Sequence, residues 1–128
     1  TALTYVRSIC PQYDVPDDYF AKHDIHIHIP EGAVPKDGPS AGITMATAMF
    51  SAVVNRKVLA KVAMTGEITL RGRVLPIGGL AAKMAHMETV LVPDKNRADI
   101  AELSREITKG LTILYMKSME DVLAAALA

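Results

Sequence analysis

Ser40 is the first residue whose surroundings suit chemistry. It follows Asp37, Gly38 and Pro39 and stands where a helix is expected to begin. The first N–H groups of a helix have no partner within the helix and, together with the helix dipole, create positive potential there. Ser40 is therefore either a helix N-cap or a nucleophile on a glycine-rich turn, with the amides of Gly38, Ser40 and Ala41 as candidates for an oxyanion hole. Its position alone does not choose between these interpretations.

Histidine is the usual base for a serine nucleophile, and the sequence contains His23, His26, His28 and His86. His26 and His28 alternate with isoleucines after Asp24, so these three polar side chains share one face of a predicted strand. That face is either a polar sheet surface or part of a two-histidine metal site. Neither a suitably placed cysteine nor a His-x-x-x-His helix completes a tetrahedral ligand set, so we expect no metal. A histidine triad stays open as an alternative.

Lysine is the other candidate base. Its ordinary pKa of ~10.4 keeps the amine protonated, and lowering that pKa by about three units costs ~4 kcal/mol and requires an apolar, weakly hydrated setting. On its predicted helix, Lys83 borders an apolar stripe of Leu80, Met84 and Met87. Either the amine is buried there and acts as a general base, or the stem lies on the stripe and the ammonium group reaches solvent.

The segment Gly38-Pro39-Ser40-Ala41-Gly42 also permits a third interpretation, a glycine-rich cradle for phosphate at a helix start. The sequence contains no G-x-x-x-x-G-K-[ST] motif, however. Lys36 is the one phosphate-seeking charge in this loop. Phosphate binding therefore remains the minor alternative.

The elements that must position these residues follow from periodicity and turn residues. Helices are predicted from about residue 2 to residue 9 and over 19–22. A strand is predicted over 24–29, with Ile25, Ile27 and Ile29 facing a core. The glycines and prolines of residues 31–39 indicate a loop, and a helix follows over 41–54. Because that helix is rich in small residues, a neighbouring element is expected to pack closely against it.

The second half of the chain predicts alternating strands and helices. Residues 62–68 and 72–76 are expected to form a hairpin around Leu70-Arg71-Gly72, and Gly78-Gly79 to introduce the helix that carries Lys83. A strand over 89–92, a helix over 97–103, a strand over 111–115 and a final helix opened by Ser118 with Glu120 follow. We expect an α/β sandwich with mixed strand pairing.

The composition sets limits on class and partners. The chain has 128 residues, half of them hydrophobic, which suits a single domain. Its 14 basic and 14 acidic residues balance, so charge indicates neither nucleic acid nor a membrane surface as partner. No apolar run approaches the ~20 residues of a membrane span. The single Cys10 suits a reducing compartment, and the early start of the first helix suggests a fragment of a longer protein.

Two stretches of the sequence resemble the Lon protease family. One is His26-Ile27-His28-Ile29-Pro30-Glu31-Gly32-Ala33 followed by Pro35-Lys36-Asp37-Gly38-Pro39-Ser40-Ala41-Gly42, which is similar to the segment around the family's catalytic serine. The other is Thr65-Gly66-Glu67-Ile68-Thr69-Leu70-Arg71-Gly72 with Val74-Leu75-Pro76-Ile77-Gly78-Gly79-Leu80, which is similar to the stretch before its catalytic lysine. The likeness spans nearly the whole chain.

The resemblance implies a role for each matching residue. Ser40 takes the position of the nucleophile and Lys83 that of the general base, so the implied enzyme is a Ser-Lys endopeptidase. Thr65 is expected to bind and orient the lysine amine, while Asp37, His26 and Glu67 support the site without performing the chemistry. The implied fold is that of the Lon proteolytic domain, which is ribosomal protein S5 domain 2-like.

The resemblance also implies a larger assembly. Family members are homo-hexamers that degrade misfolded and regulatory proteins, fed as unfolded polypeptides by an ATPase domain that uses ATP and Mg. This chain would be the proteolytic domain over residues 1–128, without that ATPase domain and without N-terminal strands, and would need no cofactor for peptide hydrolysis. The interval from Lys83 to Thr89 is a few residues shorter than is usual in the family. The expected compartment is a bacterial cytoplasm, or else a mitochondrial matrix.

The family's relatives include two classes of alternative function. Some DNA-repair proteins use Lon-like domains as scaffolds, but these are expected to lack the Ser-Lys pair. Kinases of the galactokinase and mevalonate kinase type share a distantly related fold with a glycine-rich loop, which would suit the phosphate cradle. Because Ser40, Lys83 and Thr65 are all present, an enzyme that cleaves peptides is the favoured prediction.

Overall fold

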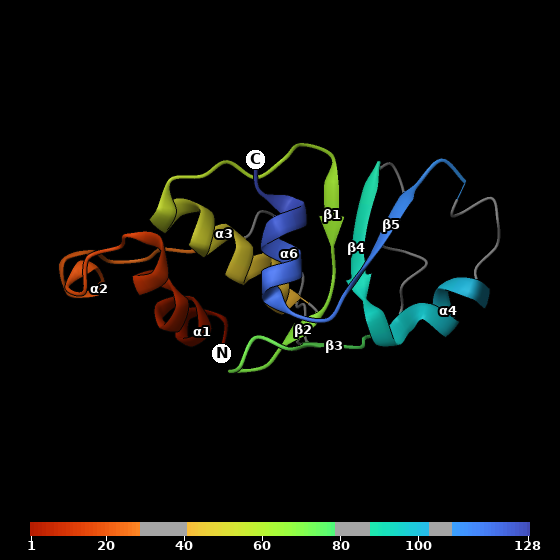
Figure 1. Ribbon diagram of the computed structural model, residues 1–128, viewed down its shortest axis with the longest axis horizontal. Helices are drawn as coiled ribbons and strands as arrows, with labels where there is room; N and C mark the ends of the chain where they lie inside the picture. The colour runs from red at the N-terminus through yellow and green to blue at the C-terminus, as the bar shows by residue number, and fades with distance from the viewer. Residues whose placement is uncertain (29–40, 79–87, 103–108) are drawn as a thin grey trace.

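A computed structural model of the chain describes residues 1–28, 41–78, 88–102 and 109–128. In Figure 1 the N-terminus lies at the lower margin of the molecule, below α1, and the C-terminus at the upper margin, above α6. The elements are α1 (Ala2–Ile9), a 3-10 turn (Cys10–Tyr13), α2 (Tyr19–Lys22), α3 (Gly42–Val54), β1 (Val62–Met64), β2 (Glu67–Ile68), β3 (Val74–Leu75), β4 (Thr89–Pro93), a second 3-10 turn (Asp94–Asn96), α4 (Arg97–Glu102), β5 (Thr112–Met116) and α6 (Met119–Ala126).

A parallel sheet of three strands, in the order β1-β4-β5, forms the middle of the fold. The central strand β4 is an apolar run in which Val90, Leu91 and Val92 are all buried. Such a run is typical of a parallel strand covered on both faces. The strand predicted over 89–92 and the strand predicted over 111–115 are therefore confirmed, each within one residue.

The two faces of this sheet carry separate cores. Leu91 points into the larger core, which it shares with α1, α3 and α6. Val90 and Val92 point the other way and pack with Ile100 of α4. Figure 1 shows the same layering, with α3 and α6 on one side of the strands and α4 on the other. The mixed α/β class is confirmed.

The hairpin predicted over 62–76 is only half correct. β2 and β3 do pair antiparallel, and the turn between them includes Gly72 with φ +82°. β1, however, belongs to the parallel sheet. The chain leaves that sheet at Gly66, where an added Cβ would lie 2.9 Å from Val74 Cγ1 and 3.3 Å from Ile43 Cδ1. Residues 62–68 therefore form two short strands in different sheets.

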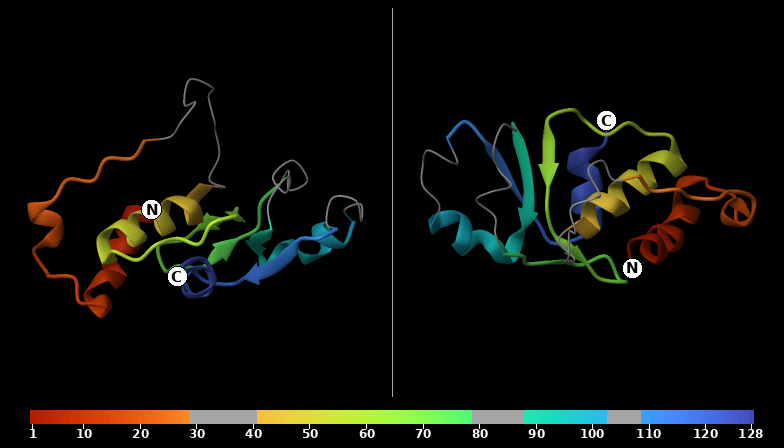
Figure 2. Two further views of the ribbon diagram at one scale, coloured as in Figure 1. Left: turned by 90° about the horizontal axis from the view of Figure 1, so that it is seen from above. Right: turned by 180° about the vertical axis from the view of Figure 1, so that it is seen from behind.

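The strand predicted over 24–29 is wrong for the residues that the structure describes. Residues 23–28 are extended but belong to no sheet, and Figure 2 shows them running apart from the rest of the chain. Ile25 is 36% exposed and Ile27 is 44% exposed, so neither faces the core. A segment with alternating apolar and polar residues forms a β-strand only where a second strand pairs with its backbone. No described strand lies beside this stretch.

The final helix begins at Ser118 as predicted, but with a different partner. Asp121 donates its backbone N–H to Ser118 Oγ at 3.4 Å, and its carboxylate accepts from the Ser118 N–H at 3.2 Å. A capping box pairs the cap residue with the third helical residue. That residue is Asp121, whereas Glu120 is the second, so the prediction of Glu120 was wrong.

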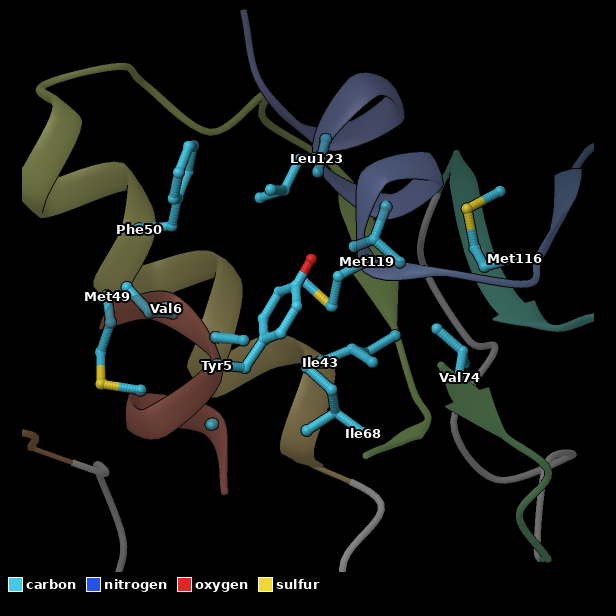
Figure 3. Packing of buried hydrophobic residues seen from close by; sticks show 14 of the residues in the cluster. Tyr5, Val6, Ile43, Met49, Phe50, Ile68, Val74, Met116, Met119 and Leu123 are labelled. Carbon is cyan, nitrogen blue, oxygen red and sulfur yellow. The ribbon is translucent and has the colours of Figure 1, made fainter. Parts of the chain in front are cut away.

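The helix predicted over 41–54 is confirmed within one residue, and α1 packs closely against it in the larger core. Tyr5 extends from α1 between Ile43 of α3 and Met119 of α6 (Figure 3). Its ring also touches the hairpin, since an added Cβ at Gly72 would lie 2.4 Å from Tyr5 Cε2. The Gly72 carbonyl in turn accepts the first N–H of α6 from Met119 at 2.7 Å. Within the described parts of the chain, no helix is long and apolar enough to span a membrane.

Gly72→Ala should destabilise the chain by about 2–4 kcal/mol, because the new methyl group meets the Tyr5 ring and a side chain is disfavoured at φ +82°. Gly110→Ala is the matched control: Gly110 has φ +79°, but no atom of the described parts of the chain lies within 4 Å of an added Cβ. It should cost only about 1–2 kcal/mol. Denaturant unfolding of both variants measures the difference, and equal losses would contradict this packing argument.

Candidate active site

Of the predicted site residues that the structure describes, Thr65, Glu67 and Ala41 lie near the carboxyl edge of the parallel sheet. Thr65 follows β1 directly, and the turn ending in Asn96 follows β4. Because parallel strands end at the same edge, residues that follow them gather there. In open α/β sheets this edge is the usual place for a ligand.

Thr65 is held firmly at this edge. Its side chain is buried, with 4% of the residue exposed, and its N–H donates to the Leu91 carbonyl at 3.1 Å. The next residue, Gly66, accepts a hydrogen bond from the N–H of Ile43 at 3.2 Å. The loop that carries Thr65 is thus joined both to the central strand and to the first turn of α3.

The first turn of α3 approaches β2 very closely at Gly42. An added Cβ there would lie 2.9 Å from Ile68 Cγ2 and 3.0 Å from the Ile68 nitrogen. Glycine is therefore required for the contact. Ala41 is the N-cap of the helix and is exposed, without a side-chain cap. The close packing predicted for this helix from its small residues is confirmed at Gly42.

A pocket of about 250 Å³ opens beside this contact. Ala41 lines it at the N-cap of α3, Gly42 and Met45 line it from α3, Glu67 and Ile68 from β2, and Thr1 and Ala2 from the start of α1. The structure therefore brings together two of the predicted site residues, Ala41 and Glu67, and buried Thr65 lies two residues before Glu67, between β1 and β2. The pocket is mostly apolar, with one carboxylate at its side.

His26 does not join this group. It lies with His28 in the exposed stretch of residues 23–28. His23 stacks on the Tyr19 ring at 4.1 Å, and its Nδ1 lies 2.9 Å from the Tyr19 carbonyl, so it takes part in ending α2. Among the residues that the structure describes, no three His, Cys, Asp or Glu side chains gather as metal ligands.

Ser40, Lys83, Asp37, Gly38 and His86 lie outside the described residues. The helix predicted after Gly78-Gly79 lies there as well. Their roles therefore stay predictions. The structure does describe the chain on both sides of Ser40 and Lys83, including Ala41 directly after the serine and Ile77 six residues before the lysine.

Cys10 is not a competing nucleophile. It is a free thiol with 1% of its surface exposed. Burial raises the pKa of the Cys10 thiol above its usual value, because the thiolate would lose its hydration. A protonated, inaccessible thiol is unreactive.

Asn96 is the polar residue at this edge that sequence reasoning missed. It is 1% exposed, and its side chain makes hydrogen bonds to both backbone groups of Ile77. The sequence signal for Asn96 was its place shortly after the buried strand β4, at the carboxyl edge of the sheet. That signal is weak, because an asparagine after Pro93, Asp94 and Lys95 is also typical of an ordinary surface turn.

Comparison with known proteins identifies the family. The profile of the Lon protease (S16) C-terminal proteolytic domain matches residues 1–128. The chain is 60% identical over 130 residues to the Lon protease of Lachnoclostridium phytofermentans, and 51% identical over 131 residues to Lon protease 1 of Bacillus subtilis. Each alignment covers 98% of this chain. The chain belongs to the Lon protease family. The predicted resemblance is confirmed.

The Lon relatives are much longer than this chain. It spans 16% of the Lachnoclostridium protein and 17% of the Bacillus protein. Both alignments are also longer than the chain's 128 residues. The alignments therefore contain positions at which the relatives have a residue and this sequence has none, while the shorter interval between Lys83 and Thr89 stays a prediction.

Gly42→Ala should lower stability by about 1–3 kcal/mol, because its methyl group forces α3 away from Ile68. The shift also moves Ala41, so peptidase activity should fall further than the loss of folded protein explains. Ala48→Ser, on an exposed position of the same helix, is the control and should change both by little. Unfolding curves and peptide cleavage measure the two effects, and a fully active Gly42→Ala protein would contradict this account.

Proposed function

We propose that this chain is the serine-lysine endopeptidase domain of an ATP-dependent Lon protease. The observation that carries the proposal is the family match over residues 1–128, because the sequence has a serine and a lysine at the two motif positions, Ser40 and Lys83. The arrangement of the described residues next to the proposed site also supports it. The helix that starts directly after Ser40 is joined to the loop of Thr65 by the Ile43 to Gly66 hydrogen bond.

In the proposed reaction, Ser40 Oγ attacks the carbonyl carbon of a peptide bond while the neutral Lys83 amine takes its proton. The amides of Gly38, Ser40 and Ala41 are candidates to receive the negative charge on the carbonyl oxygen. Lys83 then gives its proton to the leaving amine. Water, activated by the same lysine, attacks the ester and releases the second product.

The lysine must be neutral before it can accept a proton. A carboxylate beside it would raise its pKa and keep it charged, whereas a hydroxyl can orient the amine without that penalty. We assign this role to Thr65, whose burial suits an unhydrated setting. Asp37, His26 and Glu67 are proposed to shape the site. Glu67 lines the pocket beside α3, which suits contact with substrate.

The remaining proposals concern the whole protein. The names of the relatives support a protease, and their greater length leaves room for further domains. Residues 1–128 would form the proteolytic domain, a ribosomal protein S5 domain 2-like sandwich completed by further strands. ATP and Mg would serve the ATPase domain only. The substrates would be misfolded and regulatory proteins entering a homo-hexamer in unfolded form. The proposed compartment is a bacterial cytoplasm, with no role for membrane or nucleic acid.

Ser40→Ala and Lys83→Met should each lower the cleavage of an unstructured fluorogenic polypeptide by at least about a thousandfold, because each removes one half of a unit that acts together. In the parent protein the rate should fall as the pH drops below the pKa of Lys83, since a protonated amine cannot act as base. The assay is run on the intact protease. Folding of the variants is checked by circular dichroism, and full activity in either folded variant would refute the dyad.

Thr65→Val should lower kcat by about 10–100-fold, because it keeps the shape of the buried side chain and removes the hydroxyl that orients the lysine. Thr65→Ser retains the hydroxyl and should keep kcat within a few fold of the parent. Steady-state cleavage of the same polypeptide separates the two variants. Equal activity of the valine and serine variants would exclude the proposed role of the hydroxyl.

A further inference from the structure

The side chain of Asn96 holds the backbone of Ile77 by two hydrogen bonds. Asn96 Oδ1 accepts from the Ile77 N–H at 2.9 Å, and Asn96 Nδ2 donates to the Ile77 carbonyl at 2.8 Å. A side-chain amide has the same donor and acceptor as a peptide group. Asn96 therefore takes the place of a neighbouring strand for one residue.

Asp99 fixes the orientation of this amide. Its Oδ2 lies 2.6 Å from Asn96 Nδ2. A carboxylate only accepts hydrogen bonds, so the nitrogen of the asparagine must face it and the oxygen must face the Ile77 N–H. Three hydrogen bonds thus act on a side chain with 1% exposure. Buried polar groups that are fully paired in this way define a single arrangement.

The contact between Asn96 and Ile77 lies shortly before the residues that carry Lys83. Ile77 follows β3 by two residues and precedes Lys83 by six. The next residue, Gly78, is exposed, and no atom of the described residues lies within 4 Å of an added Cβ there. The Asn96 contact is therefore the last side-chain anchor on the described backbone before the residues that carry Lys83. Asn96 itself follows β4 at the carboxyl edge, the same edge at which Thr65 follows β1.

We propose that Asn96 is a positioning residue for the general base: by fixing the backbone of Ile77, it sets the direction in which the chain leaves the hairpin toward Lys83. The inference rests on the proposed function, since it takes Lys83 as the base. Without the asparagine amide, two backbone groups of Ile77 would lack their partners and the chain would shift to reach water. A shift of about 1 Å in a catalytic group can cost about a hundredfold in rate.

Asn96→Asp and Asn96→Ala test this in the intact protease. The aspartate has the shape of asparagine but cannot donate to the Ile77 carbonyl when ionised, and it lies beside the Asp99 carboxylate. Both variants should lower kcat by about 10–100-fold with KM changed less than about threefold. The acid limb of the pH-rate profile should also shift, since a displaced lysine is hydrated differently. Hydrogen exchange of a peptide containing Ile77 should accelerate about tenfold or more.

Two further variants separate positioning from general destabilisation. Ile100→Ala removes an apolar side chain from the same small core as Ile77 and leaves the Asn96 contacts in place. At a temperature where it remains folded, it should keep the parent's kcat and pH profile. Asp99→Ala removes the third hydrogen bond only. Asp99→Ala is the milder variant, to be used if the Asn96 variants do not fold. We expect it to lower kcat by about three- to tenfold with the same shift of the pH-rate profile.

The outcomes are distinguishable from failure of the proposed function. Activity retained in Ser40→Ala or Lys83→Met would overturn the dyad and this inference with it. Loss of activity in those two, with parental kcat and pH profile in folded Asn96 variants or in Asp99→Ala, would overturn the inference alone. An equal fall of kcat in Ile100→Ala and Asn96→Ala would also overturn it, because a purely structural role predicts that result.

Discussion

The burial of β4 on both faces is the constraint on which the other elements depend. Its valines and its leucine point alternately into two separate cores, and its backbone pairs with β1 on one side and β5 on the other. Because no position of this strand can shift without disturbing both layers, it serves as a fixed reference for the candidate site. Thr65 donates its N–H to Leu91 of this strand, and Asn96 follows it after three residues.

Two glycines allow the elements around this sheet to pack closely together. At Gly66 the chain passes between β3, α3 and the end of β4, and at Gly42 the helix start lies against β2. An added Cβ would lie 2.9 Å from a side-chain atom at each position, Val74 Cγ1 at Gly66 and Ile68 Cγ2 at Gly42, so the glycine backbone packs directly on the neighbouring element. The close approach of Gly42 to Ile68 forms one wall of the pocket beside Ala41 and Glu67.

Much of the fold could be predicted from the sequence because local signals and tertiary structure agree. The helical spacing of Ala2 and Val6 and the apolar run of β4 each have one straightforward interpretation, and both were confirmed. The strand predicted from residue 24 was wrong because alternating residues indicate only which side chains share a face. They do not show whether a neighbouring strand is present to pair with. The hairpin was half correct because Gly66 redirects the chain through a contact with Val74 and Ile43, which no local pattern contains.

Some residues of the candidate site could likewise be predicted from the sequence, and others could not. Thr65 and Glu67 were identified by resemblance to a family motif, and Ala41 by its place at the start of a helix. Asn96 stands outside the quoted motifs, and its hydrogen bonds go to backbone atoms of a residue 19 positions away. A partner of this kind leaves no trace in sequence spacing, because any residue type can supply a backbone N–H and carbonyl. Only the three-dimensional arrangement identifies it.

The two halves of the proposed dyad are attached to this scaffold by different means. The segment after Ser40 is fixed by the Ile43 to Gly66 hydrogen bond and the close approach at Gly42, while the segment before Lys83 is fixed by Asn96 at Ile77. Both attachments end at the carboxyl edge of the parallel sheet. The described residues beside the proposed dyad, Ala41 after Ser40 and Ile77 before Lys83, therefore share one reference, which is the buried strand β4. A lysine base needs this common reference more than a histidine does, because its four-carbon stem has more rotamers to restrict and its amine works only while neutral.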